Sequence, residues 1–239
     1  MKNRKKVLAA LLAGVMTLSM GTTVFAAAED GYALKATNTE AKSPDNDLVI
    51  AIEGSVSSMD PANIPDTNAI SATRGCYEML VAFDENQEIQ GQLAESYEVS
   101  EDSLTYTFHL REGVKFTDGT DFNAAAVKAN YDRIIDKENN LRQRRTFVVT
   151  GEDGSETYRV ESIETPDDYT VVFKLTEPWA PFINRMTQIC MISPAALEEY
   201  GNDIMNHPVG TGPFICTEWK REIIQLSSAM KITGAKKLL

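Results

Sequence analysis

Histidine and cysteine are the side chains that most often carry catalysis or bind metals, and this sequence contains few of them. It has two histidines, His109 and His207, and three cysteines, Cys76, Cys190 and Cys216. A hydrolase needs a nucleophile beside a base that a third group orients. Neither histidine lies near a nucleophile motif such as Gly-x-Ser-x-Gly, because one falls in an alternating run and the other precedes a proline. We therefore expect a protein that is not an enzyme.

Carboxylate pairs and a glycine-rich loop are the other features that could bind a metal or a phosphate. Asp167-Asp168 and Glu198-Glu199 are adjacent pairs, but no further ligand converges with them in the sequence. Gly210-Thr211-Gly212 lacks the third glycine and the Lys-Ser/Thr of a phosphate-binding loop, and a proline follows it directly. We expect solvated carboxylates, a simple turn, no metal and no cofactor.

The composition is that of an acidic protein that stays in solution. The 239 residues include 35 Asp and Glu against 23 Lys and Arg, which gives a net charge of −12. Such a surface repels phosphate groups, so it argues against nucleic acid and anionic lipid as partners. The hydrophobic residues, 43% of the chain, are enough for one large core or two small ones. We expect a monomer.

Residues 1–28 have the features of a cleavable signal peptide. Basic side chains at Lys2, Arg4, Lys5 and Lys6 precede an apolar run, and Val24-Phe25-Ala26 offers the small-x-small pattern of a signal peptidase site. The alternative is a membrane anchor, but the apolar run is too short to span a bilayer. We expect an exported protein, located in a periplasm or outside the cell.

The cysteines fit a protein that is released from the membrane after export. No cysteine precedes Cys76, so the leader lacks the residue to which a lipid anchor would be attached. Three cysteines allow at most one disulfide in an oxidising compartment, and they show no metal-ligand spacing. We expect them to be small buried side chains.

The first structural elements should follow a polar linker at residues 29–47. Residues 48–52 form an unbroken apolar run, typical of a strand covered on both faces in an α/β domain. Asp60-Pro61 marks a turn, and Asn68 is expected to cap a helix. Four residues at helical spacing would form its buried face: Ile70, Thr73, Tyr77 and Leu80.

The middle of the chain is expected to be rich in antiparallel strands. Residues 104–110 alternate apolar and polar side chains, typical of a half-buried strand. Val114 and Phe116 are expected to continue this sheet before a tight turn at Asp118-Gly119. Two further alternating runs lie on either side of Pro166-Asp167-Asp168, which predicts a second strand pair.

Three helices are predicted around these strands. Asn123 should cap one helix, residues 181–191 should form a short one, and Ser193-Pro194 should begin another that ends at Gly201. The first of these has an apolar face of four residues: Val127, Tyr131, Ile134 and Ile135. The order of elements suggests a small lobe inserted into a larger one.

One long stretch and four shorter motifs of the sequence are distinctive. The long stretch is YTFHLREGVKFTDGTDFNAAAVKANYDR at residues 106–133. The shorter motifs are Ser58-Met59-Asp60-Pro61, Tyr77-Glu78-Met79-Leu80-Val81, Leu93-Ala94-Glu95-Ser96-Tyr97 and Val209-Gly210-Thr211-Gly212-Pro213-Phe214. In this order, and over residues 48–226, they resemble the family 5 solute-binding proteins, the peptide/nickel class of ABC-importer receptors.

The resemblance implies a fold and a domain division. The fold class would be α/β with an inserted α+β subdomain, similar to type II periplasmic binding proteins, with an incomplete first lobe and the second lobe missing. Residues 48–85 and 190–226 would form the main lobe, and residues 86–189 the inserted small subdomain.

The resemblance also implies a function. The chain would be the exported substrate-binding component of an ABC importer, capturing oligopeptides or dipeptides for a membrane permease. Contacts to the peptide would come from the loop after the Asp-Pro turn: Asp66, Thr67 and Asn68. The other interpretation of these three residues is helix capping and a solvated loop. Alternatives for the whole protein are another cargo (nickel complex, haem or oligosaccharide) or a sensor or adhesion protein on the same scaffold.

The sequence departs from the family pattern in two places. Ala125-Ala126 stand where the family usually has acidic residues, so the capping box with Asn123 is lost. Residues 227–239 replace an expected Asn-x-x-Tyr-Trp-Gly segment. Back-translating this tail with common codons and reading from the third base restores Arg-Asn-Glu-Asn-Tyr-Trp-Gly. We therefore expect a frameshifted tail and a truncated receptor that lacks full binding.

Overall fold

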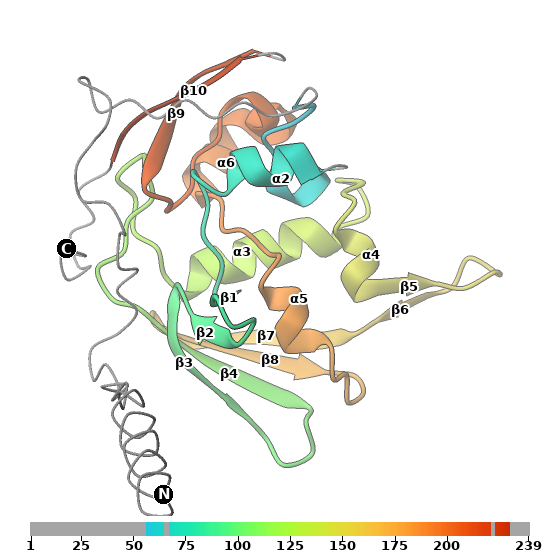
Figure 1. Cartoon of the computed structure of the whole chain (residues 1–239). Helices are drawn as coiled ribbons and strands as arrows, with labels where there is room; N and C mark the ends of the chain where they lie inside the picture. Colours follow the sequence, from blue (N-terminus) through green and yellow to red (C-terminus); the bar gives the residue numbers. More distant parts are fainter. Residues whose placement is uncertain (1–55, 65–66, 221–222, 230–239) are drawn as a thin grey trace, which may run out of the picture. The chain divides into compact units, whose positions relative to one another are not determined.

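The computed structural model describes residues 56–64, 67–220 and 223–229 (Figure 1), all within one compact unit of the chain. The predicted signal peptide, the linker, the first strand at residues 48–52 and the end of the tail lie outside these residues. The described elements are mixed α and β, as expected for part of a periplasmic-binding-protein fold.

A four-stranded antiparallel sheet is the largest element of the structure. Its strand order is β3 (Ala94–Val99), β4 (Thr105–Leu110), β8 (Thr170–Leu175) and β7 (Val160–Asp167). Period-two alternation puts the apolar side chains of the two central strands on one buried face: Tyr106, Phe108, Leu110, Val171, Phe173 and Leu175. The predicted strand at residues 104–110 and the predicted strand pair around Pro166-Asp167-Asp168 are therefore confirmed, and they belong to one sheet.

Helix α3 (Ala124–Ile135) covers the buried face of this sheet and packs against β7 and β8 (Figure 1). Asn123 caps it as predicted, because Asn123 Oδ1 accepts a hydrogen bond from Ala126 N at 3.0 Å. The Tyr131 ring lies 4.8 Å from the Phe173 ring, centroid to centroid. Two short helices complete this core, α4 (Arg144–Phe147) and α5 (Phe182–Met186); the second is shorter than the predicted helix at residues 181–191.

A second, smaller core lies beside the first. Helix α6 (Pro194–Tyr200) begins at the predicted N-cap Ser193 and ends at Gly201, whose φ is +52°. The core also includes α2 (Thr67–Thr73) and η2 (Gly201–Asn206), whereas η1 (Pro61–Asn63) contributes Ala62 to the larger core. Its buried side chains come from two stretches of sequence, before residue 78 and after residue 191: Val56, Met59, Ala69, Ala72, Cys76, Tyr77, Ile192, Ala196 and Ile204.

Three two-stranded hairpins extend from these cores. They are β1 (Val81–Phe83) with β2 (Ile89–Gly91), β5 (Val148–Thr150) with β6 (Glu156–Tyr158), and β9 (Phe214–Lys220) with β10 (Ile223–Ala229). All three pairs are antiparallel.

Two predictions, one for the helix after Asn68 and one for the strand at Val114 and Phe116, were wrong. Helix α2 ends at Thr73, so Tyr77 lies beyond the turn that follows it and Leu80 precedes β1, rather than all sharing one helix. The amides of Cys76 and Tyr77 both bond to the Thr73 carbonyl, at 2.9 and 3.1 Å, and this turns the chain. Val114 and Phe116 do not extend the sheet; they flank a single bridge between Lys115 and Asp121.

Candidate functional site

The Asp-Pro turn is a structural joint rather than an exposed binding loop. Asp60 Oδ1 accepts a hydrogen bond from Ala62 N at 3.0 Å and caps η1. Arg133 of α3 donates from Nη1 to Oδ1 at 3.2 Å and from Nη2 to Oδ2 at 2.6 Å. The two side chains are only 7% and 13% exposed. A two-pronged ion pair of this kind ties the start of η1 to α3.

The predicted solute-contacting residues lie around the start of α2. Asp66 lies outside the described residues. Thr67 is exposed, and Asn68 is half-buried. Asn68 is the second residue of the helix, so the structure contradicts the alternative prediction that it caps the helix from outside. Neither Thr67 nor Asn68 lines either of the two hollows described below.

Helix α2 has one buried and one exposed face. Ala69, Ala72 and Thr73 are buried against the smaller core. The exposed face carries residues at positions i, i+3, i+4 and i+7: Thr67, Ile70, Ser71 and Arg74. Ile70 is 43% exposed despite being aliphatic. This face carries hydroxyl groups, an apolar side chain and a guanidinium.

Gly210 and Gly212 allow two backbone segments to touch, a role that sequence reasoning missed. Gly212 N donates to Cys76 O at 2.9 Å, and Phe214 N donates to Gly75 O at 3.0 Å. A Cβ atom at Gly212 would lie 2.5 Å from the Cys76 carbonyl carbon, and one at Gly210 would overlap Cys76 O. The two glycines separated by one residue were the available signal, and they were interpreted only as a turn.

The Asp118-Gly119 turn contacts the start of α6. Gly119 has φ +88° and closes the tight turn as predicted. Ser193 Oγ donates to Asp118 Oδ2 and lies 3.3 Å from Thr120 Oγ1. Ser193 also caps α6 through Ala196 N. The turn therefore orients α6 from the side of the larger core.

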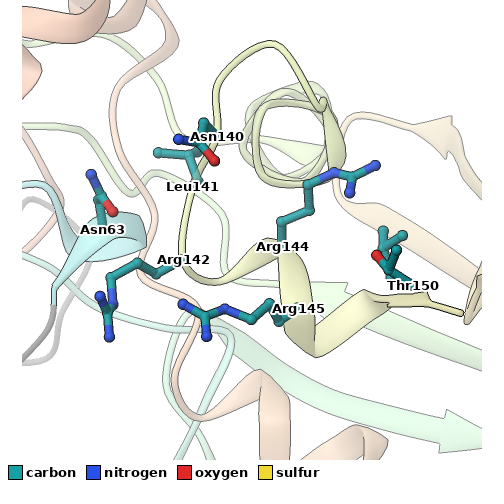
Figure 2. A pocket seen from close by; sticks show the side chains of 8 residues that line it. Asn63, Asn140, Leu141, Arg142, Arg144, Arg145 and Thr150 are labelled. Atoms are coloured by element: carbon teal, nitrogen blue, oxygen red, sulfur yellow. The ribbon is translucent and has the colours of Figure 1, made fainter. Parts of the chain in front are cut away.

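Two adjoining hollows lie where the Asp-Pro segment faces the connection between α3 and α4. One, of about 550 Å³, has Asp60 and Arg133 among its lining residues. The other, of about 420 Å³, is lined by three arginines together with polar and apolar side chains: Asn63, Asn140, Leu141, Arg142, Arg144, Arg145, Val148 and Thr150 (Figure 2). No acidic residue lines this second hollow.

Each of the two histidines lies beside a carboxylate of a nearby residue. His109 Nε2 lies 3.7 Å from Glu98 Oε1 across the exposed face of the sheet. His207 Nε2 lies 3.2 Å from Asp203 Oδ2, and its ring stacks on Tyr200 with centroids 4.1 Å apart. Within the described residues, no group of three or more His, Cys, Asp and Glu could hold a metal ion. In the same part of the chain, no helix has the length and apolarity to cross a membrane.

More than half of the chain matches the profile of a known protein family. Residues 88–229 match the bacterial extracellular solute-binding proteins, family 5 Middle. Over 177 residues the chain is 41% identical to the glutathione-binding protein GsiB of Escherichia coli. That alignment covers 73% of this chain and 33% of the relative, so the chain spans about one third of the length of the curated relatives it matches.

Two solved structures share the fold at more than 30% identity. One is the periplasmic binding protein AgaA of Agrobacterium tumefaciens in complex with agropinic acid: 31% identity, TM-score 0.67, covering 77% of this chain and 35% of AgaA. The other is the periplasmic binding protein DppA of Helicobacter pylori in complex with the peptide STSA: 32% identity, TM-score 0.61, covering 77% of this chain and 39% of DppA.

Proposed function

The chain belongs to the bacterial extracellular solute-binding proteins of family 5, and we propose that it forms the N-terminal lobe of a receptor that captures short peptides for an ABC importer. The observation that carries the peptide cargo is the 41% identity with a glutathione-binding protein, because glutathione is itself a short peptide. The similarity to a peptide-bound DppA at 32% identity supports the same cargo. The matched relatives are solute-binding proteins rather than enzymes.

The polar side chains at the start of α2 support a role for Thr67 and Asn68 in holding the peptide. Thr67 brings a hydroxyl, Asn68 an amide, and Ile70 beside them an exposed apolar surface. A peptide offers backbone donors and acceptors that such groups can satisfy, together with side chains that cover apolar surface. Asp66 directly precedes them and belongs to the same proposed contact.

We extend the proposal to the division of the chain into lobes. The smaller core is built from residues 56–77 and 192–204, and the larger from residues between them with Ala62. This division supports a main lobe at residues 48–85 and 190–226 and an inserted subdomain at 86–189, with Leu80, Val81 and Met191 of the main lobe packed into the larger core. Residues 1–28 would direct export, and the released monomer would deliver its cargo to a membrane permease.

A receptor of this type must bind its ligand better in the closed state than in the open one, so contacts from two lobes are required. We therefore expect this chain alone to bind short peptides only weakly. A chimera supplies the second lobe. In it, residues 48–226 of this chain replace the matched third of the Escherichia coli glutathione-binding protein, and the rest of that protein is kept. Glutathione and the peptide STSA are then titrated calorimetrically into the chimera and into this chain.

The chimera should bind one of these peptides at least about a hundredfold more tightly than this chain does, since two-lobe closure adds contacts. Thr67→Val and Asn68→Ala in the chimera should each weaken binding about tenfold by removing a hydrogen bond to the solute. Thr157→Val removes an exposed hydroxyl on β6 and should leave the affinity unchanged. A folded chimera that binds agropinic acid but neither peptide would assign the receptor to opines instead. Tight peptide binding by this chain alone would contradict the requirement for two lobes.

A further inference from the structure

The three cysteines gather at the smaller core, although long stretches of sequence separate them. Cys76 is one of the buried side chains of this core, and Cys190 and Cys216 pack against it half-buried. All three are present as thiols. Three thiols can form at most one disulfide within the chain, and only a pair whose Cα atoms lie within about 7 Å can do so without moving the backbone.

The backbone around Cys76 lies directly against the segment that leads into β9. Gly212 N donates to Cys76 O at 2.9 Å, and Phe214 N donates to Gly75 O at 3.0 Å. A Cβ atom at Gly212 would lie only 2.5 Å from the Cys76 carbonyl carbon, which shows how closely the two backbones approach. Cys216 lies in β9, two residues beyond Phe214. The fold therefore brings Cys76 and Cys216 together.

Both the backbone and the thiol of Cys216 act on the Cys76 sulfur. Burial raises the pKa of the Cys76 thiol to about 12, and the neighbouring Cys216 thiol adds to the rise. The Cys216 amide opposes this rise, because it donates a hydrogen bond to Cys76 Sγ. The Cα atom that carries the Cys216 side chain is bonded to this amide nitrogen. Rotation about the two Cα–Cβ bonds is therefore enough to bring the sulfurs within bonding reach.

Cys190 is placed differently from the other two cysteines. Its backbone pairs with Met79 in an isolated antiparallel bridge, three residues beyond Cys76. Apart from desolvation, the charges that act on its thiol among the described residues are those of Arg74 and Asp60, rather than that of another cysteine. The contacts therefore favour Cys216 over Cys190 as the partner of Cys76.

We propose that Cys76 and Cys216 are a redox-sensitive pair that closes to an intramolecular disulfide in an oxidising compartment. The bond ties β9 to the turn after α2, and so joins the two stretches of sequence that build the smaller core. Disulfides persist in periplasmic and extracellular proteins, and the export proposed above would bring the chain to such a place. The pairing itself rests on the contacts around Cys76 and does not depend on peptide capture.

Thiol–disulfide exchange with a low-molecular-weight disulfide supplies the oxidant. Cys216 is the more exposed of the two, so its thiolate attacks one sulfur of the small disulfide and displaces a first thiolate. The Cys76 thiolate then attacks the Cys216 sulfur of the mixed disulfide and displaces the second. The two protein thiols lose two electrons and two protons in total, and the small disulfide is reduced to two thiols that take up these protons.

The second step of this exchange should be the slow one. Cys76 is 1% exposed, and with a pKa of about 12 only a small fraction of its thiol is ionised at neutral pH. Cys76 therefore reacts through the adjacent Cys216 sulfur rather than directly with a reagent from solution.

The test begins with the reduced full chain, which is incubated at pH 8 with bis(2-hydroxyethyl) disulfide. This oxidant is neutral and is not a peptide, so peptide binding does not affect the result. The thiols titrated in urea should fall from three per chain to one. The melting temperature should rise by about 5–10 °C, because the bond closes a long loop of the unfolded chain. Dithiothreitol should reverse both changes.

Mass spectrometry of unreduced peptides identifies the bond. Digestion with trypsin alone leaves Cys190 and Cys216 in one peptide, because no lysine or arginine lies between them. A glutamate-specific protease added to trypsin cuts at Glu198 and Glu199 and separates them. The expected product is a peptide pair that contains Cys76 and Cys216.

Cys190→Ala is the matched control, and it should keep both the bond and the rise in melting temperature. Cys76→Ala and Cys216→Ala should form no bond within the chain, and oxidation should not raise their melting temperatures. Comparing each variant before and after oxidation removes the effect of the substitution itself on stability. The proposal is overturned if the native chain keeps all three thiols, if the bond contains Cys190, or if oxidation stops at a mixed disulfide on Cys216.

Discussion

The side chain of Asn130 pairs with both backbone polar groups of Ile192. Asn130 Nδ2 donates to Ile192 O at 2.8 Å, and Asn130 Oδ1 accepts from Ile192 N at 3.0 Å. Both residues are almost fully buried, at 2% and 1% exposed. The side-chain amide thus forms the same pair of hydrogen bonds that the backbone of a neighbouring strand would form. It joins α3 of the larger core to the segment that leads into α6.

Replacing Asn130 by alanine should lower the free energy of unfolding by about 2–4 kcal/mol, because it leaves two buried backbone groups without partners. Asn184→Ala removes an exposed amide on α5 and should change stability by less than about 0.5 kcal/mol. Urea unfolding followed by circular dichroism measures both. Equal stability of the two variants would mean that water replaces the lost hydrogen bonds.

The Asp60–Arg133 ion pair should contribute far more than an exposed pair on the same helix. Arg133→Met should cost about 3–5 kcal/mol, since it leaves a buried carboxylate uncompensated. Asp60→Asn keeps an oxygen acceptor for Ala62 N, so a double-mutant cycle with Arg133→Met isolates the ionic coupling. Lys128→Met breaks the exposed Lys128–Asp132 pair and should cost less than about 1 kcal/mol. Similar losses at the two pairs would contradict the structural role of the joint.

Alanine at Gly210 should be among the most damaging small substitutions in the chain. The added methyl group would overlap the Cys76 carbonyl, so two backbone segments must move apart. Gly154→Ala is a useful comparison, because Gly154 has φ +81° but open space around it, and its cost should be about 1 kcal/mol of backbone strain. Melting temperatures of the two variants test the difference. A Gly210→Ala protein as stable as Gly154→Ala would show that the segments separate easily.

The thiols of Cys76 and Cys190 should be unreactive in the folded protein. Burial raises the pKa of the Cys76 thiol to about 12, with a further contribution from the neighbouring Cys216 thiol. The Cys190 side chain is half-buried rather than fully buried as predicted, and its partial desolvation likewise raises the pKa of its thiol to about 12. Since the thiolate is the nucleophile, iodoacetamide at pH 8 should label neither residue in the native protein and both in urea. Mass spectrometry of tryptic peptides reads the labelling site by site.

These raised pKa values also predict an alkaline loss of stability. The unfolded thiols ionise near pH 9, whereas the folded ones do so near pH 12. The contribution of these two thiols to the free energy of unfolding should therefore be fully present below pH 9, and it should be lost as the pH rises from 9 towards 12. Cys76→Ala and Cys190→Ala should each flatten this decline. An unchanged alkaline slope in both variants would assign it to other groups, such as the buried phenols of Tyr77 and Tyr131, whose pKa values burial also raises.

Local patterns in the sequence were sufficient for elements whose signals lie within a few residues. Alternation predicted β4 and β8, and side-chain caps predicted the starts of α3 and α6 at Asn123 and Ser193. The motif order also predicted the family, which the profile match over residues 88–229 confirms. These features depend on backbone geometry and short-range hydrogen bonds, so neighbouring residues are enough to determine them.

Contacts between segments that are far apart in the sequence determined the features that local patterns did not predict. Helical spacing continued from Ile70 to Leu80, yet α2 stops at Thr73, and the chain beyond it packs against Gly210 and Gly212. The sequence contains Asp60 and Arg133 seventy-three positions apart, and only folding brings their charges together. The start of α4 is likewise held by distant partners, since Gln143 donates hydrogen bonds to Ala62 O and Gln188 O. Sequence periodicity describes one element at a time, whereas these relationships arise when elements bury surface against each other.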